Sequence, residues 1–185
     1  LDEGDEIAGV RMTSGSDEVI IATHNGSAIR IKEETIREMS RTAHGVKAIK
    51  LREGDYVVSM ARVRQGASVL TVSENGLGRR VELDSYRIQN RGGYGLMNYK
   101  AGNVCGIKVV DDDDDIIMIS SDGIVIRIRA CDISVMGRYS RGVRLMRVGE
   151  NEKVVTFTRT EHDSTAEIAE VEKASEEEIA AAKAE

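Results

Sequence analysis

The chain contains no proline and no tryptophan, and aromatic residues make up 3% of its 185 residues. The lack of tryptophan argues against a WD-type repeat, whose signature includes that residue. No apolar run approaches the roughly 20 residues that a membrane-spanning helix needs. The start of the chain, residues 1–6, lacks the basic and apolar regions of a signal peptide. We therefore expect a cytoplasmic protein with no membrane partner.

Cysteine and histidine are also scarce. Cys105 and Cys131 are the two cysteines and belong to no CxxC pair, which predicts buried free thiols rather than a disulfide or a metal site. The three histidines lie at neither metal-ligand nor catalytic-triad spacing. The acidic run 111–115 lacks the spacing of an EF-hand and predicts a solvated hairpin loop. The sequence therefore predicts no catalytic residue, no metal site and no bound cofactor.

The net charge of -6 is unevenly distributed. Residues 161–185 hold nine acids against two lysines, a charge of -7, so residues 1–160 carry +1 of the total. A nearly neutral body can still present a cationic face if its cations lie together. We expect the acidic tail, 161–185, to be disordered or helical.

Three markers repeat with the same two separations, 50 and 47 residues. They are the turn glycines Gly26, Gly76 and Gly123, the arginines Arg41, Arg91 and Arg138, and the glycines Gly45, Gly95 and Gly142. Each turn glycine follows Asn or Asp, a dipeptide typical of type I′ hairpin turns, and joins two β-branched-rich runs. The sequence is therefore a repeat of small β-units.

Further apolar runs complete four predicted strands per unit, including 7–10 and 46–51 in the first. Small sheets of this kind protect their edges by packing radially, as propeller blades do. We predict repeats at about 5–54, 55–103 and 104–153, with a final strand at 154–160. Because a closed ring usually needs at least four blades, and because the first unit starts at Leu1 without Met, we expect a part of a larger protein.

Each unit carries an arginine loop between its hairpin and its last strand. Glycines in the middle loop, Gly92, Gly93 and Gly95, permit close approach of a ligand to the backbone, and Arg91 has donor geometry suited to phosphate. Equivalent positions of a radial array fall on one rim, so the loops predict a curved cationic track. Its predicted cations are Arg41, Lys47, Lys50, Arg79, Arg80, Arg91, Arg138, Arg141, Arg144 and Arg147.

The natural ligand of such a track is a smooth polyanion bound through its phosphates. Few aromatic residues are available for base stacking, so duplex nucleic acid is favoured over single strands. A second interpretation is a protein-interaction module whose arginine loops bind an acidic partner. An independent enzyme is the least favoured class.

The chain resembles the carboxyl-terminal domain of the A subunit of bacterial DNA gyrase, over residues 1–160. The resemblance rests on Arg41-Thr42-Ala43-His44-Gly45-Val46-Lys47, on the stretch Leu70 to Arg80, and on Ile133 to Met146. The stretch Gln89 to Gly95 matches the family's signature box, Gln-Arg-Arg-Gly-Gly-Lys-Gly, at five of seven positions, with Asn90 and Tyr94 replacing cations. The equivalent domain of topoisomerase IV is the close rival.

This resemblance implies an all-β fold, the β-pinwheel, in which propeller-like blades share strands. Three four-stranded blades of an expected six would be present, followed by the acidic tail. It further implies that the domain binds and wraps duplex DNA and thereby supports negative supercoiling. The implied partners are the core of the gyrase A protein and the gyrase B protein in an A2B2 holoenzyme, which alone would use ATP and Mg. The implied location is cytoplasmic, associated with the bacterial nucleoid.

Overall fold

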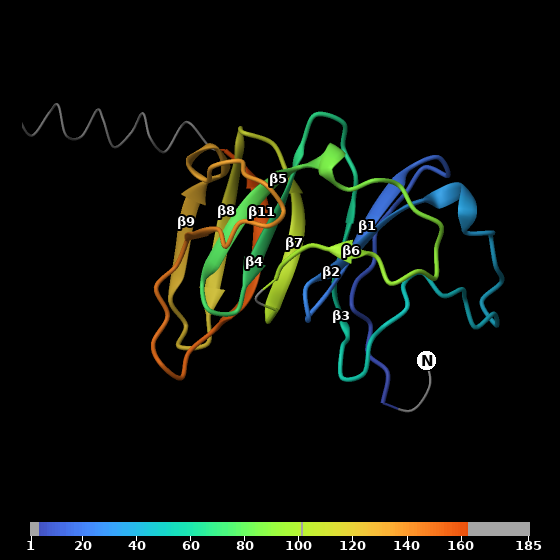
Figure 1. Cartoon of the computed structure of the whole chain (residues 1–185), viewed down its shortest axis with the longest axis horizontal. Coiled ribbons are helices and arrows are strands. Elements are labelled where there is room, and N and C mark those ends of the chain that lie inside the picture. Colours follow the sequence, from blue (N-terminus) through green and yellow to red (C-terminus); the bar gives the residue numbers. More distant parts are fainter. Residues whose placement is uncertain (1–3, 101, 163–185) are drawn as a thin grey trace, which may run out of the picture.

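A computed structural model describes residues 4–100 and 102–162, whose strands form three antiparallel sheets placed side by side (Figure 1). In sheet order, the first consists of β3 (Val57–Arg62), β1 (Glu18–Thr23), β2 (Ser27–Lys32) and β6 (Leu96–Met97). The second consists of β10 (Val143–Arg144), β5 (Leu77–Glu82), β4 (Ser68–Ser73) and β7 (Val104–Val110). The third consists of β11 (Val154–Glu161), β8 (Asp114–Ser120) and β9 (Val125–Arg129).

The only helical elements of the described residues are three short 3-10 turns, one after each hairpin. They are η1 (Glu33–Thr35), η2 (Leu83–Ser85) and η3 (Ala130–Asp132). No helix in this part of the chain is long and apolar enough to cross a membrane. The predicted all-β, blade-like architecture is confirmed.

Strands are shared between successive units. The fourth strand of the first sheet, β6, comes from the second unit, and that of the second sheet, β10, comes from the third unit. The third sheet has three strands, and no described segment pairs with the outer edge of β9. The expectation of four-stranded blades therefore holds for two of the three sheets.

The sheets divide the chain at other points than the predicted repeats. The strand expected to start each new repeat instead closes the preceding sheet, as β3 does by pairing with β1. The final strand, predicted to end at 160, extends to Glu161. The acidic tail was predicted over residues 161–185. From residue 163 onward, it lies outside the residues that the structure describes.

Blades bury the apolar residues of their central strands on both faces. Ile20 of β1 packs in one cluster with Val69 of β4 and Ile107 of β7, which joins the first two sheets. Leu70 of β4 packs with Met118 of β8 in a second cluster, which joins the second and third. Because β4 lies between two neighbours, all six of its residues are buried. The apolar runs are continuous rather than alternating for this reason.

The hairpin turns are not of the predicted type I′. That type requires positive φ at both central residues, but Asn103 is the sole non-glycine with positive φ among the described residues. The amide of Gly26 donates to the carbonyl oxygen of Thr23 at 3.1 Å, and the φ of Gly26 is 91°. The glycine thus occupies the left-handed position that follows a type I turn.

Two predicted strands do not form. Residues 7–10 are exposed and irregular, and 46–51 makes a single bridge, between Ile49 and Gly93. The equivalents of the second segment, β6 and β10, each pair with the hairpin of the unit before. No hairpin precedes the first unit within the described residues, so 46–51 lacks the edge on which a strand would form.

Candidate nucleic-acid interface

The arginine loops of the second and third units each lie against the unit before. In the middle loop, the Gly92 amide donates to the carbonyl oxygen of Ala48 at 2.7 Å, and the Lys50 amide donates to that of Gly93 at 2.8 Å. These bonds join residues 46–50 to the loop. Successive loops therefore form one continuous surface, which we call the rim and define as residues 41–52, 89–100 and 138–147.

Two of the three predicted loop arginines also bind the preceding unit. Arg91 Nε donates to the carbonyl oxygen of Thr35 at 3.1 Å, and Arg138 Nη1 donates to that of Met97 at 3.0 Å. Arg138 is half-buried, whereas Arg91 and Arg41 are exposed. Arg91 thus retains guanidinium donors that face solvent.

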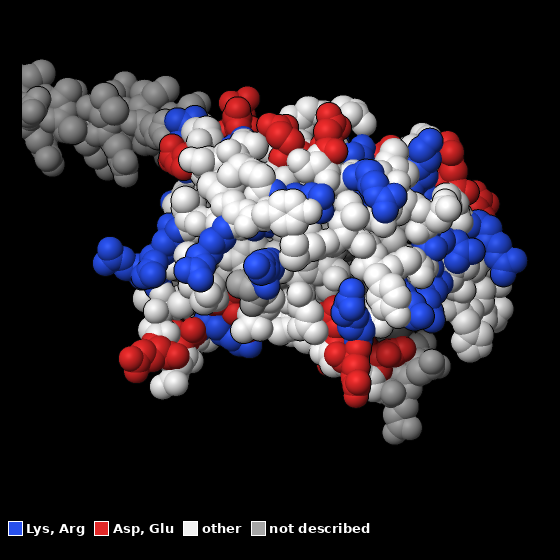
Figure 2. Space-filling model, in the orientation of Figure 1, with Lys and Arg blue, Asp and Glu red and all other residues white. Residues whose placement is uncertain are grey.

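The exposed cations of the rim lack acidic partners. Among the described residues, none of the predicted contacts within the rim takes part in an ion pair. The exposed ones are Arg41, Lys47, Lys50, Arg91, Arg141, Arg144 and Arg147. Figure 2 shows Lys and Arg side chains spread across the middle of one face, with Asp and Glu gathered along its upper and lower margins. Unneutralised cations in such a band attract a polyanion.

Tyr94 occupies the position at which the signature box has lysine. The residue is 46% exposed, and the centroid of its ring lies 4.9 Å from the Lys50 ammonium and 5.2 Å from the Arg52 guanidinium. Cation–π contacts of this length hold both cations near the ring. Two cations of the preceding unit therefore lie where the signature box would have the positive charge of its lysine.

Gly95 allows β6 to pack closely on the preceding unit, and it does not serve to let a phosphate approach the backbone. A Cβ at this position would lie 2.4 Å from the carbonyl oxygen of Ala28, and one on the equivalent Gly142 would lie 2.4 Å from that of Gly78. Both contacts are with the hairpin of the preceding unit. Gly92 and Gly93 are less crowded, because the nearest neighbours of such a Cβ lie at 3.8 Å. These two glycines remain candidates for close approach of a ligand.

Arg79, a predicted DNA contact, is fully buried. Its guanidinium donates to the carbonyl oxygens of Asn98 and Ser140 and lies 5.0 Å from the centroid of Tyr99. Burial lowers the pKa of Arg79 from its usual value. With no surface for a phosphate, Arg79 instead fixes the second and third rim segments to one another.

Arg80 is buried as well, so the prediction that it contacts DNA was wrong for the same reason. It donates to the carbonyl oxygen of Ala130 in η3 at 2.6 Å and forms an ion pair with Asp112. Its equivalent in the first unit, Arg30, is buried too, with 6% exposure. The signal that could have identified these residues is the recurrence of arginine at 30, 80 and 127, with the separations of the repeat.

The acidic run 111–115 is the predicted solvated loop only in part, since Asp112 and Asp113 are exposed in the turn before β8. Asp114 and Asp115 are buried residues of β8. Asp114 pairs with Arg64 and Arg159, and Asp115 pairs with Arg127 and is hydrogen-bonded to His162. Arginines neutralise this end of the sheet, and the described residues contain no cluster of His, Cys, Asp and Glu able to hold a metal ion.

Both cysteines are free, as predicted, but only one is shielded from solvent. Cys105 is half-buried on β7, and Cys131 is exposed in η3. The prediction of burial was wrong for Cys131 because the second position of each 3-10 turn faces solvent, as Glu34 and Asp84 do in the first two units.

Three successive segments, residues 17–64, 67–113 and 114–161, match the family described as DNA gyrase C-terminal domain, beta-propeller. The chain belongs to this family. Each matched segment contains one hairpin and the inner strand that closes its sheet, so the family's divisions follow the observed sheets. The family resemblance drawn from the sequence is confirmed.

Relatives of known name agree with this membership. The chain is 41% identical over 171 residues to the A subunit of DNA gyrase from Staphylococcus aureus strain MRSA252, an alignment that covers 89% of this chain and 19% of that protein. It is 41% identical over 168 residues to the same protein of strain NCTC 8325, covering 88% and 19%. The chain therefore spans about a fifth of the length of these relatives.

Two solved structures share the fold. The C-terminal domain of DNA topoisomerase IV superposes with a TM-score of 0.83 at 27% identity, covering 94% of this chain and 56% of that one. The DNA gyrase A C-terminal domain superposes with a TM-score of 0.72 at 30% identity, covering 78% and 50%. Each of these domains is larger than the three blades of this chain.

Proposed function

We propose that this domain of the gyrase family binds duplex DNA along the rim and wraps it, and so supports ATP-dependent negative supercoiling by a holoenzyme. The observation that carries the proposal is the row of exposed rim cations without carboxylate partners. Arg91, Arg141 and Arg144 would contact phosphates, and Gly92 and Gly93 would let the strand approach the backbone. Because backbone contacts carry little sequence information, sequence preference should be weak.

The wider assembly belongs to the same proposal. The core of the gyrase A protein and the gyrase B protein, in an A2B2 arrangement, would supply catalysis and would use ATP and Mg, while this domain would bind neither. The location would be the cytoplasm, in association with the nucleoid. Family membership supports each of these statements.

The experiment is a measurement of duplex affinity against salt concentration. Replacing Arg91 or Arg144 by Gln should weaken binding to all sequences and lower the slope of log K against log salt by about 1 for each arginine. Lys153→Gln is the matched control, since this exposed lysine pairs with Glu74 at 3.1 Å and lies outside the rim. An unchanged slope for every rim variant would contradict the assignment.

The alternative is that this chain is the equivalent domain of topoisomerase IV. The superposition on the C-terminal domain of DNA topoisomerase IV, with a TM-score of 0.83, favours it. Negative supercoiling of relaxed plasmid by the enzyme that contains this domain would establish gyrase. Relaxation or decatenation without supercoiling would establish topoisomerase IV.

Exposed tyrosines on the rim favour a second function, binding of an acidic protein. Tyr94 and Tyr139 are 46% and 71% exposed, and tyrosine and arginine are enriched at protein interfaces. Pull-down with and without nuclease separates the two functions. A partner retained after nuclease treatment supports the protein interface, and a partner lost with the nucleic acid supports DNA binding.

A further inference from the structure

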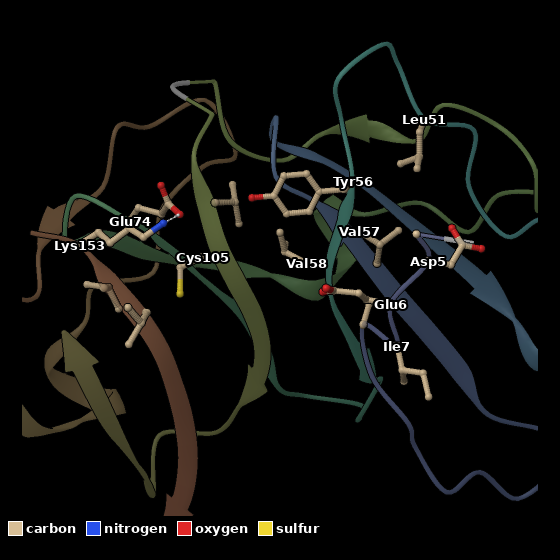
Figure 3. A pocket seen from close by; sticks show the side chains of 15 residues that line it. Asp5, Glu6, Ile7, Leu51, Tyr56, Val57, Val58, Glu74, Cys105 and Lys153 are labelled. Carbon is tan, nitrogen blue, oxygen red and sulfur yellow. Dashed lines mark hydrogen bonds and ion pairs between the residues drawn. The ribbon is translucent and has the colours of Figure 1, made fainter. Parts of the chain in front are cut away.

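Away from the rim, strands β3, β7 and β11 lie next to one another. Residues of all three strands line a groove. Residues 4–8 lie along one end of the groove, where Tyr56, Val58 and Cys105 project toward a common space (Figure 3). Farther along the same strands is a cavity of about 370 Å³. Its lining contains five cationic side chains, Arg11, Arg62, Arg64, Lys108 and Arg159.

Three of these five cations have carboxylate partners. Arg62 pairs with Asp17 at 3.5 Å. Arg64 pairs with Asp111 at 2.7 Å and with Asp114 at 3.1 Å, and Arg159 pairs with Asp114 at 2.8 Å. Three carboxylates thus face five cations, which leaves an excess of two positive charges.

Lys108 and Arg11 carry that excess. Neither forms an ion pair with a described residue, and the one hydrogen bond of the Arg11 guanidinium is to the carbonyl oxygen of Val10, at 2.6 Å. Lys108 is half-buried, with its ammonium 5.8 Å from the centroid of Phe157. Burial, and then the positive charge of Arg11, lower the pKa of Lys108. Partial burial of an uncompensated cation is unfavourable, and an anion in the cavity would reverse that cost.

Lysine is not required here by the fold. Strand registers place Lys108 opposite Leu70, and they place Ala61 and Thr158 at the equivalent points of β3 and β11. Neutral side chains therefore fit the same position in two of the three blades. Alanine and threonine fill the equivalent positions of the neighbouring blades, so packing of the strands does not require a charged side chain at position 108.

We propose that this cavity binds a phosphate dianion, either inorganic phosphate or the terminal group of a phosphate monoester, through Lys108 and Arg11. Two excess cations match two negative charges, and Arg11 offers the forked donors that suit phosphate oxygens. The site is separate from the rim and far too small for a double helix. It is thus independent of the proposed DNA contacts.

The test is calorimetric titration of the full 185-residue chain with orthophosphate at a pH near 8, where the dianion predominates. We expect one saturable site, weakened about tenfold or more in Lys108→Thr and in Arg11→Gln. Threonine is chosen because it occupies the equivalent position on β11. Circular dichroism and thermal melting of the unliganded variants establish that they are folded.

Arg129→Gln, at an exposed position of β9 outside both the rim and this cavity, is the control and should leave phosphate binding unchanged. An equal loss in that variant would mean nonspecific attraction and would overturn the site, as would the absence of saturable binding at about 10 mM phosphate. A parallel titration with AMP distinguishes the sources. Binding of AMP as tight as that of orthophosphate identifies a phosphate monoester, and binding of orthophosphate alone identifies the free ion.

Discussion

The guanidinium of Arg30 donates a hydrogen bond of 3.2 Å to the carbonyl oxygen of Leu83, which joins the first hairpin to the 3-10 turn of the second unit. The same side chain donates to the carbonyl oxygen of Tyr86 at 3.2 Å and pairs with Glu18 at 2.5 Å. Arg80 binds Ala130 of the third unit in the same way. A buried arginine at this position thus links each of these blades to the next.

Arg30→Met should therefore destabilise the domain. The change leaves Glu18 and two carbonyl oxygens without their charged donor, which should lower the free energy of unfolding by about 2–4 kcal/mol. Urea denaturation measures the effect. Arg127→Met is the matched control, because Arg127 pairs with Asp115 but binds no carbonyl oxygen of a further unit within the described chain. An equal loss in both variants would contradict the linking role.

Comparing Gly95→Ala with Gly45→Ala measures how much the close packing of β6 on the preceding unit contributes to stability. Both glycines have positive φ, 72° and 80°, so alanine carries a similar backbone cost of about 1 kcal/mol at either position. Only at Gly95 does the new methyl group meet a carbonyl oxygen, at 2.4 Å, while Gly45 has no neighbour within 4 Å. We expect Gly95→Ala to be the more destabilising by about 2 kcal/mol in urea denaturation. Equal costs would mean that the backbone conformation alone requires glycine.

The two thiols should differ in reactivity. Burial, with a further contribution from Glu74, raises the pKa of Cys105 to about 11, so little thiolate is present near neutral pH. Cys131 is exposed. At pH 8 we expect Ellman's reagent to modify Cys131 rapidly and Cys105 at least about tenfold more slowly. The variant Cys131→Ser should retain only the slow phase, and a fast phase in that variant would contradict the prediction.

Asp114 should make stability sensitive to acid. Burial opposes its ionisation, but the Asp111 amide and the guanidiniums of Arg159 and Arg64 outweigh burial, so the folded-state pKa lies below the usual 3.8. A folded pKa below the unfolded value gives stability that is complete above about pH 4 and is lost as the pH falls through the folded pKa. Asp114→Asn should be less stable at pH 7 and should show a smaller further loss on acidification. A pH dependence equal to that of the unchanged protein would exclude this contribution.

The repeat and the hairpins were predictable from sequence because both depend on local residue types. Gly26, Gly76 and Gly123 mark the turns, and the β-branched runs beside them favour strands. The cations at 41, 91 and 144 were likewise placed on an exposed surface by their position in each unit. These features require no knowledge of how one unit meets the next.

Features that depend on the neighbouring unit were missed. Arg79 and Arg80 were predicted to be surface cations because they are charged, but they point to opposite faces of β5 and the sequence does not say what covers either face. Their partners, Asn98 and Ala130, lie in rim and 3-10 segments far along the chain. The tight contact of Gly95 with Ala28 likewise spans 67 residues of sequence, and a glycine in a loop gives no sign of it.

The outer edge of β9 has a consequence for local stability. Three of its five residues are exposed, whereas the equivalent strand β5 has four buried residues of six. Edge amides without partners open to solvent with little free energy, while central strands open only with the whole sheet. In deuterium, we expect labelling to enter the third blade from β9 and to reach β4 last. Protection factors along the chain should then form a gradient, with the amides best shielded where a blade has neighbours on both sides.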